Sequence, residues 1–250
     1  MTMNNLILHI PHAAKVIPSE YLPFFKLNET DLNHEILKMT DHFTDELFQG
    51  NTTKNTVVSF PVSRLLIDPE RFENDADEPM ASRGMGCIYE KTHDGKDLKN
   101  GNVIRNQLIE KFYRPHHQVL YEKVKENLLT YNSAMIIDCH SFPKYPLPYE
   151  LDQTPNRSEI CVGADNFHTP SELTDFMISK FKGYGLGVSV NTPFSGSMVP
   201  YGFWHKDHRL RSIMIELRRD LYMDESLGNK SPKFNLIQQM ICEIFDQLEI

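Results

Sequence analysis

The sequence has few of the features that mark exported, membrane or redox-active proteins. No apolar run approaches the roughly 18 residues that a membrane-spanning helix requires, and the N-terminus shows no basic stretch followed by an apolar core. The four cysteines form no C-x-x-C pair, which disfavours a zinc knuckle and a thioredoxin-like site. We therefore expect reduced thiols, a cytoplasmic protein and no membrane partner.

Positive charge is also scarce. The chain has 34 acidic and 26 basic residues, a net charge of −8, which disfavours nucleic acid as a partner because phosphate binding needs a basic surface. The composition, 40% hydrophobic and 24% charged, is that of an ordinary globular protein. With about 150 residues in a typical domain and no visible linker or repeat, residues 1–250 are expected to form one α/β domain.

Apolar runs alternate with helical periodicities along the chain. Short apolar runs predict strands at residues 6–10, 134–138, 159–163, 187–191 and 212–217. Apolar residues at helical spacing predict helices at residues 31–49, 103–130, 171–182 and 234–248, the second of them kinked or split at Pro115. Residues 56–68 should bend at Pro61, and residues 73–102 should form a long loop. This alternation indicates an α/β fold with a mixed, largely parallel sheet flanked by helices.

Chemically useful side chains follow three of these strands. The first strand leads to His12, the strand at 134–138 to Asp138 and His140, and the strand at 212–217 to Glu216 and Arg218. Ligands in open α/β sheets bind beyond the carboxyl ends of strands. Each residue alone has an ordinary explanation, such as pairing between Glu216 and Arg218. Their convergence favours a metal hydrolase with a histidine and carboxylate site.

Seven segments carry a more specific signal. They read IPHAAKVIP, TDHFTDELF, SRLLIDPER, YRPHHQVL, IDCHSF, NTPFSGSMVPYG and IELRRDLYMDE, in that order from residue 10 to residue 225. In this order they resemble motifs of the N-formylglutamate amidohydrolases. That family is related in fold to the zinc carboxypeptidases, whose strand ends are similar to His140-Ser141 and to the segment around Glu216.

The resemblance implies a zinc site formed by His12, Asp41 and His140. The carboxypeptidases place a glutamate three residues after the first histidine, whereas this chain has Lys15 there. Asp45 is the second choice for the carboxylate ligand, since both aspartates should project from one side of the helix at 31–49. Manganese, iron or cobalt would also suit such ligands.

The chemistry assigns roles to the residues around the metal. Asp138 can accept a hydrogen bond from a ligand imidazole, and Glu216 can take a proton from water and pass it to the leaving amine. Neighbouring arginines are expected to keep Glu216 ionised. Arg64 is the candidate donor to the oxyanion.

Residues for binding the substrate follow from the same resemblance. Arginine binds carboxylates with two hydrogen bonds, so the candidates begin with an arginine. They are Arg71, Arg114, Asn191 and Gly196, with His117 as an alternative on the helix of Arg114. The acidic Glu70 stands where the family usually has asparagine, and would weaken binding of an anion if it faced the pocket.

The sequence therefore predicts a zinc-dependent amidohydrolase that acts on a small N-acyl amino acid. The first choice of substrate is N-formyl-L-glutamate, which would give formate and L-glutamate in histidine degradation. One alternative is a carboxypeptidase-like peptidase or amidase acting on peptides or cell-wall fragments. Another is a metal-binding relative that has lost catalysis. The oligomeric state is left open.

Overall fold

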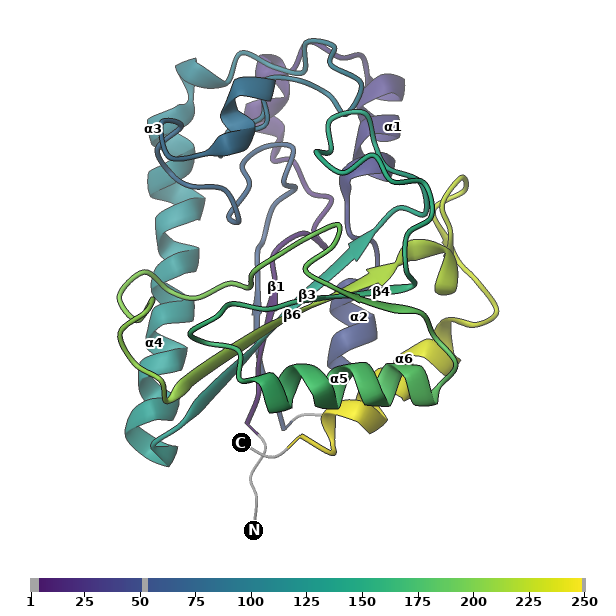
Figure 1. Cartoon of the computed structure of the whole chain (residues 1–250). Helices are drawn as coiled ribbons and strands as arrows, with labels where there is room; N and C mark the ends of the chain where they lie inside the picture. Colours follow the sequence, from purple (N-terminus) through teal and green to yellow (C-terminus); the bar gives the residue numbers. More distant parts are fainter. Residues whose placement is uncertain (1–4, 51–53, 249–250) are drawn as a thin grey trace.

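A six-stranded sheet forms the centre of the computed structural model, which describes residues 5–50 and 54–248 (Figure 1). The strand order is β2-β1-β3-β6-β4-β5. The strands are β1 (Ile7–Ile10), β2 (Thr56–Ser59), β3 (Ala134–Phe142), β4 (Ile160–Gly163), β5 (Val188–Val190) and β6 (Leu210–Arg218). All neighbouring pairs among them are parallel except β4 with β6, which confirms the predicted mixed, largely parallel sheet.

Helices cover both faces of this sheet. The helices are α1 (Glu29–Met39), α2 (Thr44–Gln49), α3 (Arg105–Leu108), α4 (Arg114–Tyr131), α5 (Ser171–Gly183) and α6 (Phe234–Phe245). Short 3-10 turns lie at Ser19–Phe24, Pro79–Arg83, Gly101–Val103 and Arg219–Leu221, and a small hairpin pairs β7 (Met223–Asp224) with β8 (Asn229–Lys230). No helix in the described part of the chain is both long and apolar enough to cross a membrane.

The two faces of β3 carry different side chains: one face packs into the main hydrophobic core, and the other carries polar residues near its carboxyl end. Met135, Ile137 and Cys139 point to one face, where they pack against α2, α5 and α6. Ala134 and Ile136 point to the other face and pack against α4. Because side chains alternate along a strand, Asp138, His140 and Phe142 also project toward the α4 side. The polar end of that face, beyond the apolar contacts of α4, is where the candidate site lies.

One predicted helix is wrong and another is confirmed as split. The single helix expected at 31–49 is wrong: α1 ends at Met39, Thr40 is extended, and α2 begins only at Thr44. Phe43 takes a left-handed conformation, with φ of 64°, to make the turn. The helix at 103–130 is split as expected. Pro115 lies in the first turn of α4, and the turn before it, Ile109–Tyr113, is π-helical because proline has no N–H to continue the ladder.

Candidate active site

Three side chains from separate parts of the chain meet beyond the sheet. His12 follows β1 directly, His140 lies near the carboxyl end of β3, and Asp41 lies in the break between α1 and α2. The backbone N–H of Asp41 donates to the carbonyl of His12 at 3.0 Å, which fixes the break against the end of β1. All three side chains are at least 96% buried.

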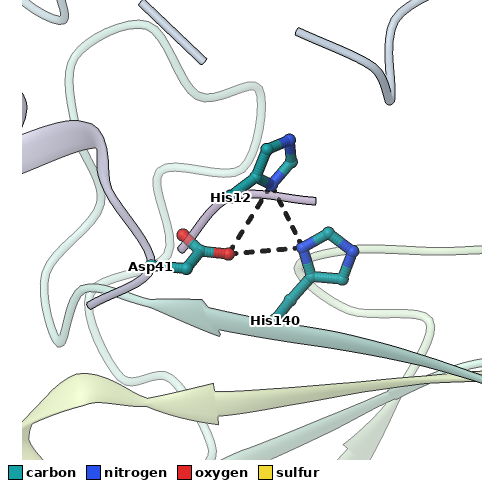
Figure 2. A group of neighbouring side chains, drawn as sticks. All are labelled: His12, Asp41 and His140. Atoms are coloured by element: carbon teal, nitrogen blue, oxygen red, sulfur yellow. Dashed lines mark hydrogen bonds and ion pairs between the residues drawn. The ribbon is translucent and has the colours of Figure 1, made fainter. Parts of the chain in front are cut away.

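The distances within this group match a metal site. The His12 and His140 Nδ1 atoms are 3.3 Å apart, and Asp41 Oδ2 lies 3.3 Å from His140 Nδ1 and 3.6 Å from His12 Nδ1 (Figure 2). Ligands bound at 2.0–2.1 Å around a tetrahedral zinc ion are about 3.3–3.4 Å from one another. The three residues named as metal ligands therefore fit a divalent ion.

Carboxylates behind the two histidines set which ring nitrogen faces the ion. His12 Nε2 lies 2.9 Å from Asp68 Oδ1, and His140 Nε2 lies 3.1 Å from Asp138 Oδ1. An imidazole that donates its Nε2–H to a carboxylate keeps its Nδ1 lone pair free for a metal. Asp138 was expected in this role. Asp68 was not, although its place in the SRLLID segment was the available signal.

The Asp68 carboxylate is held ionised by its surroundings. Burial alone would raise its pKa, but the Arg64 guanidinium and His12 outweigh burial and keep the pKa of Asp68 well below its ordinary value. Arg64 Nη2 donates to Asp68 Oδ2 at 2.8 Å, and Arg64 Nη1 lies 3.9 Å from Asp41 Oδ1. Arg64 therefore lies beside the metal-ligand group, as its predicted role requires.

A second arginine supports the Asp41 ligand. Arg219 Nη2 donates to Asp41 Oδ1 at 2.9 Å, which leaves Oδ2 toward the histidines. Burial would raise the pKa of Asp41, but His12, His140 and Arg219 together hold it well below its ordinary value. The sequence prediction named Arg218 rather than Arg219. Arg218 instead donates to Asp220 at 2.7 Å and to the carbonyl of Arg157 at 2.7 Å.

Glu216 lies next to His140 across the sheet. The two residues are register partners in β6 and β3, and Glu216 is only 6% exposed. Its Oε2 atom has no hydrogen-bond partner within the described residues. Burial is the main reason that the pKa of Glu216 is raised to about 8, with Asp41 adding to the shift. The expectation that nearby arginines keep this carboxyl ionised is therefore wrong for the metal-free protein, because burial outweighs the effect of His140, Arg219 and Arg64, which lower the pKa of Glu216.

The acidic Glu70 turns inward, toward imidazoles. Its Oε1 lies 3.3 Å from His9 Nδ1 and its Oε2 lies 3.5 Å from His140 Nε2. His9 also contacts Asp138 Oδ1 at 2.8 Å and, through Nε2, His116 Nε2 at 2.9 Å. His9, Glu70 and Asp138 form a second group of side chains that could hold a metal ion, but the 2.8 Å hydrogen bond between His9 and Asp138 is shorter than the spacing between tetrahedral metal ligands.

Three further residues predicted from the sequence, Arg71, His117 and Arg114, are not part of the metal-ligand group. Arg71 is 23% exposed, close to Asp68 and Glu78, and its Nε has no hydrogen-bond partner among the described residues. His117 Nε2 lies 2.9 Å from the carbonyl of Pro69, just before Glu70. Arg114 is 54% exposed and pairs with glutamates on the surface.

The loop after β5 is shaped by its own asparagine. Asn191 has a φ of 53°, and its side chain binds the backbone of Ala164 and the N–H of Gly196. Gly196 has a φ of 81°, a conformation that favours glycine. Both residues thus act on loop shape, close to Met198, whose N–H donates to Asp138 at 2.9 Å. Asp45 is exposed on α2, apart from the ligand group.

Comparisons with known proteins identify the family and the fold of this chain. The N-formylglutamate amidohydrolase (FGase) family model matches residues 4–223. The crystal structure of N-formylglutamate amidohydrolase from Ralstonia eutropha JMP134 is similar, with a TM-score of 0.84 and 20% identity, covering 96% of this chain and 91% of that chain. Gene product Atu2144 from Agrobacterium tumefaciens has a TM-score of 0.68 and 20% identity, covering 99% of this chain and 92% of its own. No curated protein matches the chain.

Because both solved structures are only 20% identical to this chain, their similarity establishes the fold alone. The family match extends over most of the sequence and includes His12, Asp41, His140 and Glu216. The chain therefore belongs to the N-formylglutamate amidohydrolase family, a family of hydrolases that act on an amide bond.

Proposed function

We propose that this chain is a zinc-dependent amidohydrolase that converts N-formyl-L-glutamate and water to formate and L-glutamate, in histidine degradation. The observation that carries the proposal is the group of His12, Asp41 and His140, with ligand spacing and with Glu216 beside it. Two imidazoles and one carboxylate leave a fourth position open, which is the usual arrangement of catalytic zinc sites. The expected cytoplasmic location stays a prediction.

The bound metal would supply Lewis acidity, which polarises the carbonyl and makes a water easier to deprotonate. Glu216 takes a proton from that water and delivers it to the amide nitrogen as the C–N bond breaks. The free Oε2 of Glu216 suits this task, because no described side chain occupies it. A divalent cation nearby favours the carboxylate form of Glu216 and so lowers its pKa from about 8 toward a value useful to a base.

Two arginines complete the proposed chemistry. Arg64 is held by Asp68 and Asp41 at the edge of the ligand group, where it can stabilise negative charge on the carbonyl oxygen. Arg71, whose Nε has no hydrogen-bond partner among the described residues, is assigned to the α-carboxylate of the amino acid. Because Glu70 faces His9 and His140, its charge is compensated and does not oppose an anionic substrate.

Metal analysis of the purified chain, with formate release from N-formyl-L-glutamate before and after chelation, tests the proposal. About one zinc per chain and chelator-sensitive formate release would support it. Metal without formate release would refute this substrate and direct the assay to other N-acyl amino acids and to peptides. Absence of bound metal after reconstitution with zinc would refute the metal-dependent mechanism.

A further inference from the structure

A cavity of about 340 Å³ opens beyond the carboxyl ends of β3 and β6. It is lined by Lys144, Tyr145, Pro155, Asn156, Arg157, Ser158 and Arg218. Three of these side chains are cationic and none is acidic. None of the seven is a metal ligand or the proposed base, so the cavity is separate from the ligand group.

The cavity lies on the same face of the sheet as the metal ligands. Arg218 is two residues after Glu216 on β6, and its register partner is Phe142, two residues after His140 on β3. Side chains two apart on a strand share a face, and a step of two residues advances about 6.6 Å. The Phe142 and Arg218 row is therefore the next one along this face, toward the carboxyl end, and Lys144 lies just past it.

The cations of the cavity pair with carboxylates outside its lining, but not all of their nitrogen atoms are hydrogen-bonded. Lys144 and Arg218 share one carboxylate, Asp220, at 3.2 Å and 2.7 Å, and Glu159 lies 3.9 Å from Arg218. Arg157 uses Nη2 for Glu150 and for the carbonyl of Asp152. Its Nε and Nη1 atoms have no hydrogen-bond partner among the described residues, although its side chain is only 1% exposed. These two nitrogens are buried donors that the described residues leave without an acceptor, which favours binding of an anion nearby.

We propose that this cavity binds the side-chain carboxylate of the substrate, with Lys144 and Arg218 as the residues that contact it. This inference rests on the proposed function. In a glutamyl substrate the distal carboxyl carbon is four bonds from the amide nitrogen, a reach of about 5 Å with bonds of about 1.5 Å. The carboxylate oxygens lie about 1.2 Å beyond that carbon, so the full reach is about 6 Å, close to the step of about 6.6 Å from the Glu216 row to the Arg218 row. An aspartyl substrate falls one bond short.

With this cavity, the α-carboxylate and the side-chain carboxylate of one substrate have separate binding residues. Arg71 lies on the side of Asp68 and β1, whereas Lys144 and Arg218 follow β3 and β6. The α-carboxylate and the side-chain carboxylate therefore meet cations on opposite sides of the ligand group. Arg157 acts through position and charge, since Phe142 and Phe194 lie against its guanidinium, with Cζ 5.9 Å and 5.8 Å from the ring centres.

The test compares an acidic substrate with its neutral amide. The wild-type chain and Lys144→Met are assayed with N-formyl-L-glutamate and N-formyl-L-glutamine. We expect Lys144→Met to raise KM for the glutamate compound about tenfold, with little change in kcat, and to leave the glutamine compound unaffected. Lys182→Met, an exposed lysine at the end of α5, is the matched control and should change neither. Equal effects on both substrates, or none, would overturn the proposal.

A binding measurement separates this inference from the proposed reaction. Calorimetry with L-glutamate and L-glutamine, on zinc-loaded protein, needs no turnover. Weaker L-glutamate binding by Lys144→Met than by Lys182→Met, with unchanged L-glutamine binding, would support the subsite even if no formate were released. Formate release with unchanged L-glutamate binding in both Lys144→Met and Arg218→Met would keep the reaction and refute the subsite.

Discussion

His12 and His140 turn the same ring nitrogen toward each other, with their Nδ1 atoms 3.3 Å apart. Each uses its other nitrogen, Nε2, to contact a buried carboxylate, Asp68 or Asp138. Two imidazoles that both donate from Nε2 present their Nδ1 lone pairs to the same space, which favours a metal ion or a proton between them. The carboxylates thus prepare the site for a metal before it binds.

Removing a ligand should remove the metal. We expect Asp41→Asn and His140→Ala to lower zinc content and formate release together, because each ion would lose one of three protein ligands. Asp45→Asn is the matched control, since Asp45 lies four residues further along the chain, on α2, and is exposed. Metal analysis of the three variants decides the point. Full zinc content in Asp41→Asn, or loss of zinc in Asp45→Asn, would contradict the assignment.

Loss of the Asp68 carboxylate, which contacts His12, should weaken zinc binding almost as much as loss of a metal ligand. We expect Asp68→Asn to weaken zinc binding by about 10- to 100-fold, the usual cost of losing such a partner. Part of that effect comes from Arg64, which would lose the carboxylate that orients it. Competition with a chromogenic chelator measures the affinity. Unchanged affinity would mean that His12 is held by packing rather than by this hydrogen bond.

The strands could be predicted because each contains a short apolar run, although β3 continues four residues beyond its predicted end, so that His140 lies within the strand. That pattern placed His12, His140 and Glu216 correctly at one edge of the sheet. The break at Thr40 could not be predicted in the same way. Its cause is not in the local sequence, since the N–H of Asp41 is satisfied by His12, 29 positions earlier in the chain.

Contacts between residues that are far apart in the sequence could not be predicted either. Arg219 reaches Asp41 from the far end of the chain, and a run of two arginines does not show which one turns inward. Strand alternation alone would favour Arg218, which shares the face of Glu216 at the end of β6, whereas Arg219 contacts Asp41 from the turn that follows the strand. The inward turn of Glu70 likewise depends on His9, which only the fold brings near.

Loss of the base should separate catalysis from metal binding. We expect Glu216→Gln to retain zinc and to lower kcat for N-formyl-L-glutamate by at least about 100-fold, because a positioned base contributes roughly that factor or more. The amide has nearly the same shape, so folding should be preserved. Zinc analysis and steady-state kinetics on the same sample give both quantities. Near-normal turnover would assign the proton transfer to another group.

The ionisation of Glu216 should appear in the pH profile. A base works only when it is deprotonated, so kcat/KM should rise with pH through the pKa of Glu216. In the metal-free protein burial raises this pKa to about 8, and the cation in the zinc-loaded enzyme should lower it. We therefore expect an acid limb with its midpoint below 8. A profile that is flat from about pH 5 to 9 would argue against an ionisable base with this environment.

The His9 network should make the metal-free protein lose stability as pH rises. Hydrogen bonds and charges from Asp138 and Glu70 overcome the opposing effect of burial and raise the pKa of His9 to about 9 from 6.5. A raised pKa in the folded state stabilises it fully below pH 6.5, and this contribution is lost as pH rises through about 9. A shift of this size corresponds to roughly 3 kcal/mol. We expect the difference in Tm between wild type and His9→Gln, measured without metal, to be larger at pH 6 than at about pH 10, whereas His34→Gln, at an exposed position on α1, should differ little from wild type at either pH. A difference that is constant across this range would show that His9 contributes by packing alone.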